Sequence, residues 1–139
     1  MIDKFFSLEE AESMIPKLEK IVQNMVVTKK NAMEIGDELA ALQEQMKAGN
    51  RVNASALVNK RTELEFLVKI INEGLEAIED MGARPKDIDS GLVDFPTMID
   101  GEEALLCWKY GEKSIDFYHS LTAGFAGRKP LKKGSITLR

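Results

Sequence analysis

We predict an α+β fold, because helical and strand patterns occupy separate parts of the chain. Apolar residues recur at heptad spacing from Leu18 to Met46 and again from Leu57 to Met81, which is typical of long amphipathic helices. After Gly82 the chain changes to short apolar runs separated by glycine-containing turns, as in antiparallel sheets. The sequence therefore predicts a long antiparallel helical hairpin plus a short N-terminal helix, with a small three-stranded antiparallel β-meander.

The N-terminal helix is predicted from a capping box. In the run Ser7-Leu8-Glu9-Glu10, the Ser7 hydroxyl can accept from the third helical amide while Glu10 reaches back to the Ser7 amide. Pro16 follows about two turns later, where it would remove a backbone hydrogen bond from a continuing helix. We expect a short helix over Leu8–Met14, with a kink or a restart near Pro16.

The two heptad runs should be two helices joined by a short loop. The first ends at Gly49-Asn50, and the second ends at Gly82, which is typical of a left-handed C-terminal cap. Two long helices with a short connection must run antiparallel. A second apolar stripe on the later helix, formed by Phe66, Ile70 and Ala77, needs a cover: the C-terminal segment, the N-terminal helix or another copy of the chain.

Three strands are expected after a linker. Pro85 disfavours helix at its neighbour, so Arg84-Pro85-Lys86-Asp87 is interpreted as the linker. The expected strands are Leu92–Ile99, Ala104–Tyr110 and Ile115–His119. Pro96 has no amide proton for a β-ladder, so the first strand should be an edge strand or should bulge there.

The dipeptide Asp100-Gly101 predicts the register of the first two strands. A two-residue hairpin turn at this point places Asp94 opposite Cys107 and Val93 opposite Trp108. Because side chains alternate between the faces of a sheet, Trp108 then belongs to an apolar face that should pack on the helices. Asp94 and Cys107 belong to the other, mixed face.

The face of the third strand depends on the next turn. An even-length turn at Gly111-Glu112 would put His119 on the Trp108 face, across the sheet from Cys107. A single β-bulge would reverse this assignment.

We expect one domain over residues 1–139. Its parts are the helices (8–82), a linker (83–89), the meander with a glycine-rich loop (90–128) and a basic tail (129–139). The tail carries no acidic residue and is usual for a solvated terminus.

Composition excludes several classes of protein. The formal net charge is -4, so nucleic-acid binding is not expected. No stretch approaches the roughly 20 apolar residues of a membrane helix, and the N-terminus does not resemble a signal peptide. A single cysteine cannot form an intrachain disulfide. These features indicate a cytoplasmic protein that does not enter membranes.

The specialised side chains gather between Gly91 and Arg128, which includes the only Cys, Trp and His. The ligand-binding candidates are Asp94, Glu112, His119 and Arg128. The loop Gly124–Arg128 could cradle an anion, or it could be a turn that closes the sheet onto the helices. Arg128 should either clamp an internal carboxylate, with Asp94 and Glu112 as the candidates, or bind a ligand's carboxylate; we favour the internal clamp.

Metal binding and nucleophilic catalysis receive little support from spacing. Asp94, Cys107, Glu112 and His119 are all zinc-ligand types, but none of them forms a close ligand pair along the chain. Cys107 and His119 are the two weaker candidates for a metal ligand, and the predicted register places them on opposite faces of the sheet. A half-buried histidine and an apolar buried cysteine are the alternative. The same separation removes a Cys–His nucleophilic pair. We therefore predict no catalytic residue, no cofactor and no metal.

The chain resembles a bacterial family catalogued as domain of unknown function 2203. The resemblance rests on five segments: Phe6–Ala11, Gly91–Pro96, Leu106–Trp108 with Gly111-Glu112, His119 and Gly124–Arg128. It implies a small cytoplasmic bacterial protein with no assigned activity. It marks motif positions, namely Asp94, Cys107, Trp108, Glu112, His119 and Arg128, without giving them roles.

The function expected from these observations is a non-catalytic protein-interaction or scaffolding module that self-associates. The hairpin would form a homodimer and the meander would present a surface to an unknown protein partner. The alternative is a small-anion or metal-binding domain, with or without enzymatic activity, whose site lies on the meander.

Overall fold

The computed structural model describes residues 4–132 and has a mixed α+β architecture. The helices are α1 (Leu8–Ser13), α2 (Ile15–Lys47), α3 (Ala54–Asp80) and the short 3-10 helix η1 (Phe125–Gly127). The strands are β1 (Arg84–Asp87), β2 (Leu92–Ile99), β3 (Glu102–Lys109), β4 (Phe117–Ser120) and β5 (Lys129–Pro130). Of the predicted basic tail, residues 133–139 lie outside the described part.

The N-terminal helix begins with the predicted capping box. The Ser7 hydroxyl accepts from the Glu10 amide at 3.1 Å, and the Glu10 carboxylate accepts from the Ser7 amide at 3.2 Å. Pro16 lies in the first turn of α2, where a helix has no backbone bond to lose. The chain therefore ends α1 at Ser13 and restarts at Ile15.

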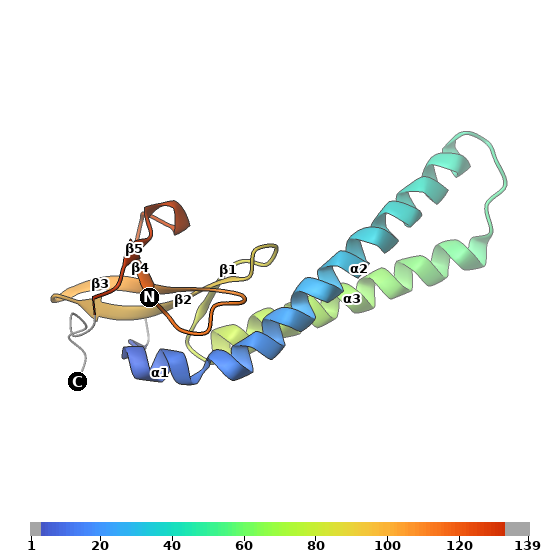
Figure 1. Ribbon diagram of the computed structural model, residues 1–139. Helices are drawn as coiled ribbons and strands as arrows, with labels where there is room; N and C mark the ends of the chain where they lie inside the picture. Colours follow the sequence, from blue (N-terminus) through green and yellow to red (C-terminus); the bar gives the residue numbers. More distant parts are fainter. Residues whose placement is uncertain (1–3, 133–139) are drawn as a thin grey trace.

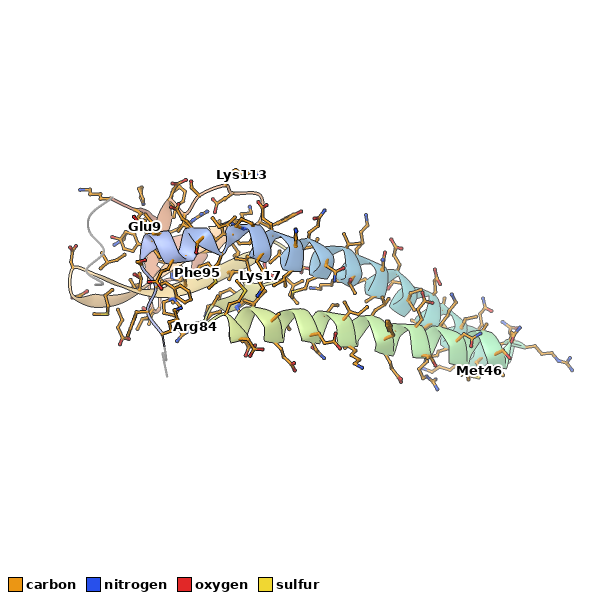
Figure 2. All side chains as sticks on the ribbon, turned by 90° about the horizontal axis from the view of Figure 1, so that it is seen from below. Glu9, Lys17, Met46, Arg84, Phe95 and Lys113 are labelled. Atoms are coloured by element: carbon orange, nitrogen blue, oxygen red, sulfur yellow. The ribbon has the colours of Figure 1, made fainter. Side chains whose placement is uncertain are left out.

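Helices α2 and α3 lie side by side and project away from the sheet (Figure 1). Asn53 caps α3, because its side-chain oxygen accepts from the Ser55 amide at 2.9 Å. The packing between the helices loosens with distance from the sheet. Leu18 is fully buried near the sheet, whereas Met46 is 49% exposed at the far end of the hairpin (Figure 2).

The sheet has five antiparallel strands in the order β1-β2-β3-β4-β5, so the prediction of a three-stranded meander was wrong. The two additional strands come from segments predicted as linker and tail. Each contains a proline and a lysine, residues that occur on sheet edges because they discourage further pairing. The amino-acid composition of a short edge strand therefore resembles that of a linker.

The predicted turn and register between β2 and β3 are confirmed. Asp100 and Gly101 both have positive φ, 51° and 81°, as a type I′ turn requires. Asp94 pairs with Cys107 and Val93 with Trp108.

Strand β2 is not an edge strand, which corrects the prediction made from Pro96. Strand β1 pairs with residues 92–94 of β2 only, so Pro96 lies beyond its end and its missing amide proton is not needed. Its carbonyl oxygen instead accepts from the Phe6 amide at 2.7 Å.

The core lies between the sheet and the adjacent ends of the helices (Figures 1 and 2). Trp108, Phe95 and Val93 are at most 1% exposed and pack with residues of α1, α2 and α3. The Trp108 face of the sheet is therefore the face that packs on the helices, as predicted. Within residues 4–132, none of the helices combines the length and the apolar character that crossing a bilayer requires.

Candidate metal-binding site

Three side chains with metal-binding donor atoms meet on the sheet face opposite the helices. Asp94 comes from β2, Cys107 from β3 and His119 from β4. The three residues are 1%, 1% and 3% exposed. One ligand atom from each lies within 4.8 Å of the others. Three consecutive strands thus bring a carboxylate, a thiol and an imidazole together.

The placement of His119 corrects the sequence-based register. Cys107 pairs with Phe117 and Leu105 with His119. His119 therefore shares the face of Cys107, whereas an even-length turn would have put it on the Trp108 face. The register is shifted by one residue, and a one-residue shift moves every side chain of a strand to the other face.

The connection between β3 and β4 explains this shift. It runs from residue 110 to residue 116 and is not a tight turn at Gly111-Glu112. Glu112 closes its first part, because its carboxylate accepts from the Lys109 amide at 2.7 Å and its carbonyl oxygen accepts from the Trp108 indole at 3.0 Å. The second part is tied to α1, where the Glu12 carboxylate accepts from the Ile115 amide at 2.9 Å. The connection is therefore longer than a two-residue turn, and the register that follows from it places His119 on the Cys107 face.

The hydrogen bonds of His119 identify the nitrogen available to a metal. Its Nδ1 lies 2.8 Å from the carbonyl oxygen of Ser120. A carbonyl oxygen can only accept, so Nδ1 carries a proton. Its Nε2 lies 3.1 Å from Oδ2 of Asp94. A ring held by a backbone carbonyl at one nitrogen, with the other nitrogen directed at the site, is the usual arrangement of a metal-binding histidine.

Burial shapes the protonation of the other two groups. Loss of solvent raises the pKa of the Asp94 carboxyl, and the neighbouring His119 opposes that rise. Burial, and then the charge of Asp94, raise the pKa of the Cys107 thiol to about 11. Without a metal, Cys107 is therefore a thiol at neutral pH. A bound cation would favour the thiolate, because coordination removes the proton outright.

The three residues of the cluster line a cleft of about 270 Å³. The other residues that line it are Lys86, Leu92, Leu121, Thr122, Gly124 and Phe125. Gly124 has a φ of 66° and a ψ of -170°, a backbone region that is nearly restricted to glycine. The chain turns there into η1, which stands on the side of the sheet away from α1 (Figure 1).

The remaining two candidates, Glu112 and Arg128, pair with each other beside the cluster. The Arg128 guanidinium donates to both Glu112 carboxylate oxygens, at 2.7 and 2.6 Å, and stacks on the Phe117 ring at 4.0 Å. It also donates to the carbonyl oxygen of Cys107 at 3.5 Å. Of the two carboxylates predicted as partners of Arg128, Glu112 is the one that its guanidinium contacts.

Sequence reasoning identified every residue of the cluster but did not bring all three together. Of the other residues that line the cleft, Lys86 falls in the segment predicted as a linker, and Leu121 carries no chemical signal of its own. Phe125 belongs to the loop Gly124–Arg128, which the sequence marks as a candidate anion site. The register of β1 with β2 shifts between Pro85 and Asp87, so two-residue alternation could not have placed Lys86 on the face of Asp94.

The fold and the cluster together define an α+β protein with a helical hairpin and a buried carboxylate–thiol–imidazole cluster on its sheet. The chain belongs to the family described as Uncharacterized conserved protein (DUF2203), whose model matches residues 4–131. No curated protein and no solved structure matches the chain.

Proposed function

We propose that this protein binds a divalent transition-metal ion, with zinc as the leading candidate, through Asp94, Cys107 and His119. The observation that supports this proposal most directly is the convergence of three different donor atoms within 4.8 Å, on buried side chains from three strands. Buried groups of this kind are expensive unless something compensates them. A cation shared by all three is such a compensation.

The types of donor favour zinc over harder cations. A thiolate and an imidazole suit Zn²⁺ and its first-row neighbours, whereas Mg²⁺ and Ca²⁺ prefer sites made of oxygen atoms. Zinc is typically four-coordinate, and three protein ligands with one open position are typical of its catalytic and ligand-binding sites. The cleft over the cluster provides access to that open position.

The proton distribution around His119 agrees with this proposal. Nδ1 donates to the Ser120 carbonyl oxygen, and Nε2 faces Asp94 at 3.1 Å. In the metal-free protein one proton has to lie between Nε2 and the carboxylate. A metal ion in that position would replace the proton and would be bound by both groups.

Metal analysis of the purified protein tests the proposal. We expect one zinc ion per chain after dialysis against limiting Zn²⁺. Replacement by Co²⁺ should produce the thiolate-to-metal charge-transfer band, and Cys107→Ser should abolish it. His119→Gln and Asp94→Asn should each lower the affinity for the metal by at least about tenfold. Changes to groups that only contact a metal ligand already lower metal affinity by about 10- to 100-fold.

Asp116→Asn provides the matched control. Asp116 is an exposed carboxylate in the connection between β3 and β4, and its replacement should leave metal binding unchanged. Absence of stoichiometric binding of any first-row metal would overturn the proposal. The cluster would then be a hydrogen-bonded network that stabilises the fold.

Self-association through the hairpin is a second proposal, supported by the exposed apolar side chains of α2 and α3. Val27, Met33, Val58 and Phe66 are between 53% and 60% exposed. Two helices alone cannot bury both sides of their apolar seams, and two hairpins packed together would form a four-helix bundle. Sedimentation should therefore reveal a dimer that Phe66→Glu weakens, and a strict monomer at micromolar concentration would contradict it.

A further inference from the structure

We infer that the cleft above the cluster binds a small monocarboxylate with a short apolar tail, whose carboxylate would complete the coordination of the metal. This inference rests on the proposed metal site. It adds the chemical class of the ligand, which the donor cluster alone does not specify.

The charge balance of the site favours a singly charged anion. A divalent ion with one carboxylate and one thiolate is electrically neutral, and neutral His119 adds no charge. Lys86 lines the same cleft as Asp94, Cys107 and His119, so its charge adds to that of the site. The resulting single positive charge matches a monoanion, while a dianionic phosphate would require more cationic groups.

Three further cations lie near the cleft but are not among the residues that line it. Arg84 is the partner of Asp94 in the register between β1 and β2. Arg128 is neutralised by Glu112, which holds its guanidinium through both carboxylate oxygens. The Lys109 Nζ lies 5.8 Å from the centre of the ring of Phe125, which lines the cleft. Lys109 therefore adds to the attraction of an approaching anion.

The walls of the cleft favour an apolar tail. Leu92, Leu121 and Phe125 line it, and Leu121 and Phe125 are 46% and 44% exposed. Covering such side chains with methylene groups releases water from both surfaces. The volume of about 270 Å³ suits a ligand at or below the smaller end of drug-sized molecules.

Calorimetric titration of the zinc-loaded protein with acetate, butyrate and hexanoate tests the inference. Affinity should rise about twofold with each added methylene, less than full burial would give, because the cleft is open on one side. In the Co²⁺ form, each carboxylate should shift the visible absorption bands, since it enters the coordination sphere.

Two variants separate the head and tail contributions. Lys86→Met should weaken hexanoate and acetate alike, by about fivefold, the upper range for an exposed charge pair. Phe125→Ala should reduce the dependence on chain length and leave acetate affinity unchanged. Lys113→Met is the matched control, because Lys113 is exposed and pairs with Glu19, away from the cleft. This substitution should change neither the affinity for acetate nor the affinity for hexanoate.

The outcomes distinguish this inference from the proposal beneath it. Stoichiometric zinc with no carboxylate binding, or with binding that Lys86→Met and Lys113→Met affect equally, would overturn the ligand assignment and leave the metal site intact. Failure to bind metal would overturn both.

Discussion

The Arg128 guanidinium holds both carboxylate oxygens of Glu112 while it stacks on the Phe117 ring. The two side chains are 13% and 28% exposed, so water screens their pairing only in part. The pair joins the β3–β4 connection to the segment that follows η1. It therefore fixes the two loops that border the cluster.

Removing Arg128 should destabilise the protein. Arg128→Ala leaves the Glu112 carboxylate without its partner, and we expect a loss of about 2–4 kcal/mol in the free energy of unfolding, as for other partly buried ion pairs. Lys129→Ala, at the exposed neighbouring position, should change stability by less than about 0.5 kcal/mol. Urea denaturation of both variants measures the difference, and equal midpoints would show that the pair contributes nothing.

Two helical glycines should respond to alanine in opposite directions. A Cβ at Gly36 would meet no atom within 4 Å, so Gly36→Ala should stabilise α2 by about 0.5–1 kcal/mol. A Cβ at Gly74 would lie 2.6 Å from Cγ and Sδ of Met25, which is 2% exposed. Gly74→Ala should therefore cost about 1–3 kcal/mol through overpacking.

Thermal denaturation of the two glycine variants and of the unchanged protein shows whether each substitution raises or lowers the stability. A stabilising effect of Gly74→Ala would mean that α2 and α3 are farther apart than described. The close approach of the two helices at Gly74 would then be incorrect.

Stability should be concentrated at the sheet end of the hairpin. Leu18 is fully buried, so Leu18→Ala should cost about 2–5 kcal/mol. Leu64 is only half-buried, so Leu64→Ala should cost about 1 kcal/mol in a monomer. Chemical denaturation at several protein concentrations measures both. A large loss at Leu64 that depends on protein concentration would indicate that a second copy covers this part of the seam.

Cys107 should react slowly with thiol reagents in the metal-free protein. Its pKa of about 11 leaves very little thiolate at pH 8, and the side chain is 1% exposed. We expect alkylation at least about tenfold slower than that of free cysteine. Denaturant should restore the rate of the free amino acid. Rapid labelling of the folded protein would contradict both the burial and the raised pKa.

The sequence by itself determined the elements that depend on local chemistry. The capping box at Ser7, the restart at Pro16 and the Asp100-Gly101 turn act over a few residues, and each was predicted from a few residues. The same turn sufficed to place Asp94 opposite Cys107 and Val93 opposite Trp108, since a two-residue hairpin leaves the register no freedom.

Tertiary structure decided the face of His119 and the edges of the sheet. The face depends on the length of the 110–116 connection, which contacts Glu12 on α1, far away in the sequence. Strands β1 and β5 are short, polar and proline-containing, so they form only because β2 and β4 offer them hydrogen-bonding partners. The cluster of Asp94, Cys107 and His119 is thus a product of long-range packing, because alternation along a strand makes its location depend on a shift of one residue.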